Sequence, residues 1–145
     1  MTRKSLSVLI YPILLVILLD VIFTLLGQPP QYWQSYSLVR EGSPLGVSFL
    51  QASPFIFVLF MLAYTCLIVF LLKKLPRFWS LILGLTVYSG HLYGSGTWIY
   101  VLYLKSRLPD SPFAHWYLTI GYYIIISFIS VLIVYKKISK ADKIV

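Results

Sequence analysis

The chain has 145 residues, of which 59% are hydrophobic and only 11% are charged, with a formal net charge of +8. A soluble domain carries about 25% charged residues, and a water-soluble core of this size could not cover so much apolar surface. The composition excludes an ordinary soluble domain and predicts an integral membrane protein with one domain over residues 1–145.

Four segments are long and apolar enough to cross about 30 Å of hydrocarbon as helices of about 20 residues. They cover about residues 5–27, 53–72, 78–104 and 111–135. The second and fourth open with Ser53-Pro54 and Ser111-Pro112, which pair a capping serine with a proline at the first helical position. The predicted fold class is all-α, an integral membrane bundle of four transmembrane helices connected up and down.

The loop of residues 28–52 is the longest predicted connection. Its second half begins with another Ser-Pro pair, Ser43-Pro44, and predicts a short extracytoplasmic interfacial helix near residues 43–50. The alternative is that this segment extends the second span outward, with a kink at Pro54.

Nine of the twelve lysine and arginine residues lie in three clusters, at residues 3–4, 73–77 and 136–143, each beside an apolar stretch. Lys and Arg concentrate in cytoplasmic segments, so this alternation predicts that both termini face the cytoplasm. Clusters at helix ends meet acidic lipid headgroups, so we expect the bilayer as a partner and no nucleic acid. The interpretation is a bacterial plasma (inner) membrane protein.

Asp20 lies inside the first predicted span, between Leu19 and Val21. An ionised carboxylate in hydrocarbon is costly, so its side chain must face partners or water, and a functional role is the default. The alternative is a structural tie near the membrane rim, in which Asp20 bonds Gln28, Arg40 or a tyrosine and holds the loop down. Thr24 lies one turn further along the same face and can share its contacts.

A glycine-rich segment, residues 90–98, lies in the third predicted span. Gly90 and Gly94 form a pair of small residues four apart, which is typical of a helix-packing surface. His91, Ser95 and Trp98 fall on one helix face. A lone buried histidine is often a hydrogen-bonded structural residue, so structural and functional roles for His91 both stay open.

Glu41 is the only glutamate and precedes the short outer helix. It either forms a surface salt bridge or folds inward to join Asp20 and His91 in an outward-opening cavity. Such a trio has the ligand types for a divalent metal and the acid and base groups for hydrolysis. These three residues are therefore the candidate catalytic and metal-binding residues, and the sequence indicates no particular cofactor.

The sequence carries no His-Glu-x-x-His, Gly-x-Ser-x-Gly or Cys-x-x-Cys motif. Cys66 is the single cysteine, which excludes a disulfide within the chain, and its apolar neighbours predict a buried side chain. A non-enzymatic role is therefore favoured over an enzymatic one.

Asp20-x-x-x-Thr24, followed by Glu41-x-x-Pro44, resembles a pattern in small bacterial membrane proteins with four spans. Those proteins carry Asp-x-x-x-Thr in the first span and Glu-x-Asn-Pro before the second, whereas Ser43 stands here in place of the Asn. The resemblance covers only the N-terminal third and implies no activity. It implies that Asp20, Thr24 and Glu41 belong to one constellation.

Three functional hypotheses follow. The first is an accessory or assembly subunit of a larger membrane complex, which contacts other membrane helices or a second copy through the Gly90 and Gly94 surface. The alternative is an outward-facing site of Asp20, Glu41 and His91 for metal or ligand binding or hydrolysis. A further alternative is a small proton-coupled dimeric transporter that uses Asp20 as its carboxylate.

Overall fold

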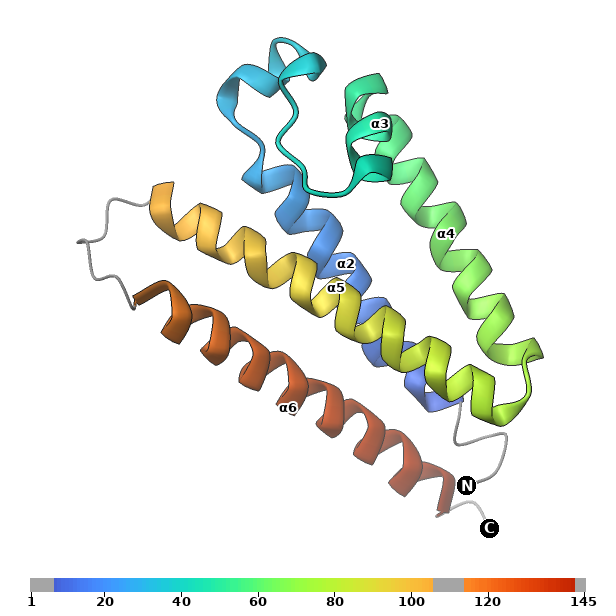
Figure 1. Ribbon diagram of the computed structural model, residues 1–145. Coiled ribbons are helices and arrows are strands. Elements are labelled where there is room, and N and C mark those ends of the chain that lie inside the picture. The colour runs from blue at the N-terminus through green and yellow to red at the C-terminus, as the bar shows by residue number, and fades with distance from the viewer. Residues whose placement is uncertain (1–6, 106–113, 143–145) are drawn as a thin grey trace.

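The computed structural model describes residues 7–105 and 114–142, and these residues contain no strand (Figure 1). Their α-helices are α2 (Ile10–Gly27), α3 (Pro44–Ala52), α4 (Pro54–Lys74), α5 (Arg77–Lys105) and α6 (Ala114–Asp142). Three short 3-10 helices accompany them: η1 (Ser7–Leu9), η2 (Pro30–Trp33) and η3 (Tyr36–Leu38). The prediction of an all-α chain is confirmed for these residues.

Within residues 7–105 and 114–142, three helices are long and apolar enough to cross a membrane: α2, α4 and the Tyr117–Lys137 part of α6. The predicted third span is also a helix, the 29-residue α5, but it is not among these three. The glycine-rich segment of α5 and its polar residues, such as His91, lower the mean hydropathy of this helix. The predicted start of the fourth span, Ser111-Pro112, lies outside the described residues.

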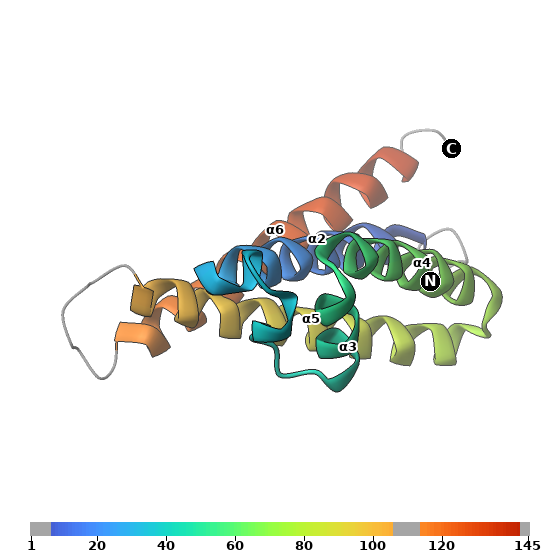
Figure 2. The same cartoon turned by 90° about the horizontal axis from the view of Figure 1, so that it is seen from above.

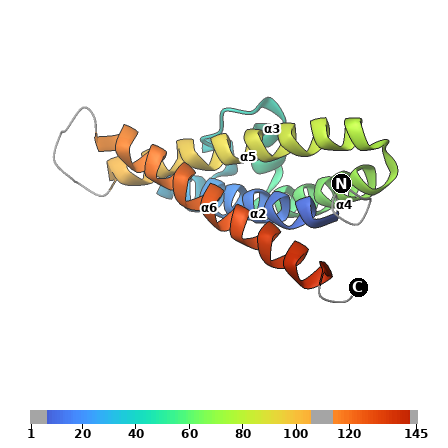
Figure 3. The same cartoon turned by 90° about the horizontal axis from the view of Figure 1, so that it is seen from below.

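The helices α2 and α5 make the most extensive contact and form the centre of the bundle (Figures 1 and 2). The helix α4 flanks this pair on one side and α6 on the other, and Figure 3 shows α6 crossing the bundle at an angle. Apolar side chains of α2, α4 and α5 form a shared buried cluster of Ile13, Ile17, Ile68, Leu72 and Val87. Burial is therefore concentrated where these three helices meet.

The helix α6 is joined to α5 by pairs of hydroxyl groups. The Tyr122 hydroxyl donates to Oγ of Ser95 over 2.8 Å, and the Tyr88 hydroxyl donates to Oγ of Ser130 over 3.1 Å. Hydrogen bonds between helices supply specific attraction in a membrane, where apolar contacts compete with lipid tails. These bonds attach the helix that otherwise exposes most of its apolar side chains.

Cys66 is exposed on α4, so the prediction that it is buried was wrong. The helix α4 is apolar around its whole circumference, and only Phe57, Ile68 and Leu72 are buried on it. A uniform apolar sequence does not reveal which side of a helix meets protein and which side faces outward.

One end of the bundle carries basic side chains. The start of α2, the turn between α4 and α5 and the end of α6 lie together there (Figure 1). The end of α4, the start of α5 and the end of α6 contribute Lys73, Lys74, Arg77, Lys136 and Lys137. The Lys137 ammonium lies 4.3 Å from the centre of the Tyr11 ring, which links the end of α6 to the start of α2.

Residues 28–52, which we call the cap, lie at the opposite end of the bundle (Figure 1). Serine side chains begin its helix and the next one: Ser43 accepts from the Gly46 amide over 3.2 Å, and Ser53 from the Ile56 amide over 3.0 Å. Ser53 has an extended backbone. The helix α3 is therefore separate from α4 and not an outward extension of it.

Tyr32 anchors the cap. Its ring is fully buried in a cluster with Leu50 and Phe57, and its hydroxyl donates a 3.0 Å hydrogen bond to the Leu50 carbonyl. That carbonyl is one that the end of α3 leaves unpaired, because the residue four positions on is Pro54, which has no N–H. Burial, with a smaller effect of Tyr36, raises the pKa of Tyr32 and keeps its hydroxyl a donor.

We expect Tyr32→Phe to loosen the cap, because the Leu50 carbonyl would lose its partner inside an apolar cluster, at a cost of about 1–3 kcal/mol. Hydrogen exchange of the detergent-solubilised protein should become faster in α3 and stay unchanged at the contact of α2 with α5. Tyr36→Phe is the matched control, since its half-exposed hydroxyl makes no hydrogen bond within the described ranges. Equal exchange in the two variants would contradict the anchoring role.

Candidate functional site

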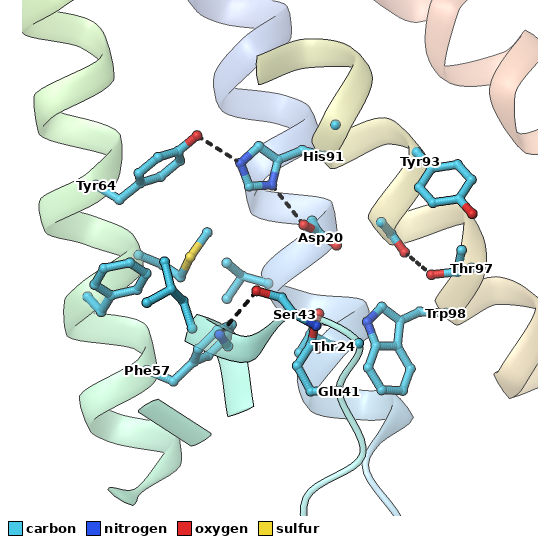
Figure 4. Close-up of a pocket in the computed structure, with 18 of the residues that line it drawn as sticks. Asp20, Thr24, Glu41, Ser43, Phe57, Tyr64, His91, Tyr93, Thr97 and Trp98 are labelled. Carbon is cyan, nitrogen blue, oxygen red and sulfur yellow. Dashed lines mark hydrogen bonds and ion pairs between the residues drawn. The ribbon is translucent and has the colours of Figure 1, made fainter. Parts of the chain in front are cut away.

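A pocket of about 1040 Å³ opens between α2, α4, α5 and the cap (Figure 4). Most of its wall is apolar or aromatic. Its lining residues are Asp20, Val21 and Thr24 of α2; Arg40, Glu41, Gly42, Ser43, Leu45 and Gly46 of the cap; Phe57, Phe60, Met61 and Tyr64 of α4; and Thr86, Val87, Gly90, His91, Tyr93, Gly94, Thr97, Trp98 and Val101 of α5. The candidate residues Asp20, Glu41 and His91 thus line one pocket.

Asp20 and His91 are joined directly across the contact of α2 with α5. Oδ2 of Asp20 lies 2.7 Å from Nδ1 of His91, within both hydrogen-bond and ion-pair range. The side chains are 19% and 15% exposed, so they are largely withdrawn from the surroundings. An aspartate that contacts Nδ1 of a histidine orients the ring and directs its other nitrogen away from the carboxylate.

The other ring nitrogen of His91 faces α4. Nε2 lies 3.4 Å from the Tyr64 hydroxyl, and the two ring centres are 5.6 Å apart. Figure 4 shows the resulting line from Tyr64 through His91 to Asp20 across the pocket. Polar contacts therefore connect α4, α5 and α2 at one level of the bundle.

Gly94 permits this arrangement. A Cβ atom at Gly94 would lie 2.8 Å from Oδ1 of Asp20, so a larger residue would displace either the carboxylate or the backbone of α5. Gly90 is different, because a Cβ atom there would meet nothing within 4 Å. Of the two glycines predicted to form a packing surface, only Gly94 makes a close helix contact within the chain, and Gly90 faces the pocket.

The three supporting residues predicted near this site have different positions. Thr24 is buried and lines the pocket. Trp98 is also buried, and its ring occupies the space that a side chain at Gly27 would need. Ser95 is fully buried but faces α6, where it accepts the Tyr122 hydrogen bond, so it lies outside the pocket.

Gln28 holds the cap over the pocket. Its Nε2 donates to the carbonyl of Arg40 over 2.9 Å, and its Oε1 accepts from the Arg40 amide over 2.9 Å. The same Nε2 lies 3.0 Å from the Thr24 carbonyl of α2. This buried amide therefore pairs with the backbone beside Glu41 and fixes that segment against the end of α2.

Glu41 points into the pocket rather than forming a surface salt bridge. Oε1 accepts from the Ser43 amide over 3.0 Å, whereas Oε2 is buried and has no hydrogen-bond partner in the part of the chain that the structure describes. Its side chain also contacts Gly46, where a Cβ atom would lie 2.8 Å from Cγ of Glu41. Burial is the main cause that raises the pKa of Glu41; the Ser43 amide opposes it, Asp20 adds to it, and the Gly42 amide opposes it weakly.

The geometry does not assemble a metal site from these candidates. Among residues 7–105 and 114–142, no three His, Cys, Asp or Glu side chains form a group that could hold a metal ion. Asp20 and His91 bond each other instead, and Glu41 interacts with Asp20 without a direct hydrogen bond. Within the same ranges no serine or cysteine side chain bonds the His91 ring as a nucleophile would.

Comparison with known proteins gives no functional assignment: no protein-family model, curated protein or solved structure matches the chain. The site is therefore interpreted from its own chemistry.

The role of Tyr64 was missed in the sequence, and Gln28 was expected only as a possible partner of Asp20. Tyr64 sits in a continuous apolar run, and only its position relative to His91 distinguishes it from other tyrosines. Gln28 sits in a turn, where a polar residue is ordinary. A signal for Gln28 existed in its place directly after the first span, beside the Asp20 and Thr24 face.

We expect Gly94→Ala to destabilise the protein by about 1–3 kcal/mol, because the added methyl group collides with Asp20. Gly90→Ala is the matched control, since its methyl group enters open space and alanine favours a helix by up to about 1 kcal/mol. Unfolding of both variants by denaturing detergent, followed by circular dichroism, measures the difference. Equal stability of the two variants would refute the packing role of Gly94.

Proposed function

We propose that this chain is a four-span membrane protein whose pocket binds a small amphipathic molecule in the outer half of the membrane. The observation that carries the proposal is the Asp20–His91 pair, held by Gly94 at the edge of a large and mainly apolar pocket. The proposal has two parts, the membrane arrangement and the binding role, and each has its own test.

The case for α5 as the remaining span rests on where its polar groups go. His91 bonds Asp20, Ser95 bonds Tyr122, and the Thr97 hydroxyl donates to the Gly94 carbonyl over 2.6 Å. Polar side chains satisfied inside a bundle are tolerated at membrane depth. The composition of α5 thus fits a central helix flanked by α2, α4 and α6 rather than one that faces lipid all round.

The position of the basic residues supports cytoplasmic termini. Lys73, Lys74, Arg77, Lys136 and Lys137 gather at one end of the bundle, while the cap lies at the other. Because Lys and Arg collect on the cytoplasmic side, the cap and the pocket beneath it belong to the extracytoplasmic side.

Protease protection separates four spans from three, because an even number of spans places both termini on one side and an odd number on opposite sides. In intact cells, epitope tags at Met1 and at Val145 should both resist protease added outside. A tag inserted between Gln34 and Ser35 of the cap should be cut. Cleavage of exactly one terminal tag would overturn the four-span arrangement.

The binding role follows from the composition of the pocket. Small-molecule sites are concave, largely apolar and contain a few placed polar groups, with volumes of about 300–1,000 Å³. This pocket is at the upper end of that range, with apolar walls from α4 and polar groups at Asp20, His91 and Glu41. A titratable pair inside a membrane bundle is by default a functional site.

The hypothesis of an accessory subunit rests on the Gly90 and Gly94 surface. Gly94 packs against Asp20 of the same chain, whereas Gly90 is exposed and lines the pocket. The subunit, hydrolase and transporter roles stay predictions, because no specific contact in the described residues favours any of them.

We expect Gly90→Leu to abolish ligand retention, because the new side chain enters the pocket without displacing a neighbour. Gly121→Leu is the matched control: it also enters open space, but it lies on α6 away from the pocket. Native mass spectrometry of protein purified in mild detergent should show a bound small molecule on the wild type and on Gly121→Leu, and none on Gly90→Leu. The binding role is wrong if all three proteins carry the same adducts or none.

A further inference from the structure

We propose that the ligand of this pocket is a protonated amine attached to an apolar chain, with the Glu41 carboxylate as its counter-ion. This inference rests on the proposed binding role and names the chemical class of the molecule that is bound.

The first argument is the balance of charge in the pocket. Asp20 is already paired with His91 at 2.7 Å. Glu41 has no ion-pair partner among the described residues. Arg40 is the only lysine or arginine among the lining residues, and it is exposed. Its contacts with Gln28 are made by its backbone and not by its guanidinium group. The uncompensated group of the pocket is therefore an acid, and a cation is the ligand that balances it.

The second argument is the unpaired oxygen of Glu41. Oε1 has the Ser43 amide, but Oε2 is buried and finds no donor in the described chain. A buried acceptor without a donor is unfavourable, and far more so when it carries charge. The Cγ and carboxylate of this side chain lie over Gly46, where no side chain intervenes. An ammonium group supplies both the missing donor and the missing positive charge.

The third argument is the aromatic wall. Trp98, Phe57, Phe60, Tyr64 and Tyr93 line the same pocket as Glu41. Figure 4 shows Trp98 and Phe57 on either side of Glu41 in that view, with Tyr64 further along the wall. Aromatic faces attract cations, and their apolar area accommodates a hydrocarbon chain. One end of the pocket thus suits an ammonium group and the rest suits an apolar chain.

Other ligand classes fit less well. An anionic headgroup would meet Glu41 and Asp20 without a buried cation to receive it. A metal ion would lack a third protein ligand, because no suitable group of three exists within the described ranges. A neutral amphiphile would fill the apolar part but leave the Glu41 charge unbalanced, and it is the alternative that the experiment must separate.

The test compares dodecylamine with 1-dodecanol, which has the same chain and no charge. Wild-type protein in phosphatidylcholine nanodiscs is titrated with each compound at neutral pH, and binding is followed by native mass spectrometry and by thermal stabilisation. Glu41→Gln keeps the size of the side chain and removes its charge. Asp142→Asn is the matched control, because it removes one negative charge at the other end of the bundle.

We expect the wild type and Asp142→Asn to prefer the amine over the alcohol by roughly tenfold or more, as a charge-assisted hydrogen bond predicts. Glu41→Gln should lose this preference while still binding the alcohol. Equal binding of amine and alcohol to the wild type, or an undiminished preference in Glu41→Gln, would overturn the inference.

The same titrations keep the two proposals apart. If both compounds bind the wild type equally and Gly90→Leu blocks them, the pocket binds amphiphiles and only the amine assignment fails. If neither compound binds and no adduct co-purifies, the binding role itself fails, and the amine assignment with it.

A last arm identifies the source of the amine, since a free lipophilic amine and an ethanolamine lipid headgroup share the ammonium group. Nanodiscs that contain phosphatidylethanolamine should displace dodecylamine if the headgroup is the ligand. They should leave its binding unchanged if a free amine is the ligand.

Discussion

The bond between Asp20 and His91 is the interaction on which the rest of the structure depends. It joins the two central helices at 2.7 Å, and it exists because Gly94 lets the backbone of α5 come close to the carboxylate. A carboxylate without such a partner would be costly inside hydrocarbon. The pair therefore both permits an acid inside the bundle and determines how closely α2 and α5 approach, and that approach shapes one wall of the pocket.

In the proposed four-span arrangement, lipid and protein place opposite demands on α5. A helix that faces lipid should be apolar, yet α5 carries His91, Ser95 and Thr97 in its second half. The structure reconciles these demands by surrounding α5 with three other helices and by giving each of these side chains a hydrogen bond. The more apolar helices, α4 and α6, take the outer positions and expose most of their side chains.

Local signals in the sequence predicted the elements well. The pairs Ser43-Pro44 and Ser53-Pro54 placed the starts of α3 and α4 at the residues where the structure has them, because serine capping and proline at the first position are properties of a few neighbouring residues. The suspicion of a site at Asp20 came from the cost of a carboxylate inside a membrane, which is also a local property. Its meeting with Glu41 and His91 was only one of two alternatives, because it depends on how the outer loop folds.

Features that depend on distant residues could not be predicted in this way. Which side of the uniformly apolar α4 faces protein decides the position of both Cys66 and Tyr64, and no periodic pattern in α4 records it. The pairing of Gln28 with Arg40 depends on how a long connection folds back. Gly90 and Gly94 look equivalent along the chain, yet only the packing of α2 distinguishes them.

The two hydroxyl pairs between α5 and α6 have a mechanical consequence. Tyr88 and Ser95 lie about two helical turns apart on α5, and Ser130 and Tyr122 lie about the same distance apart on the antiparallel α6. A slide of α6 by one turn would therefore break both bonds together and restore neither. The outermost helix, although it exposes most of its surface, therefore has one register in which both hydroxyl pairs form.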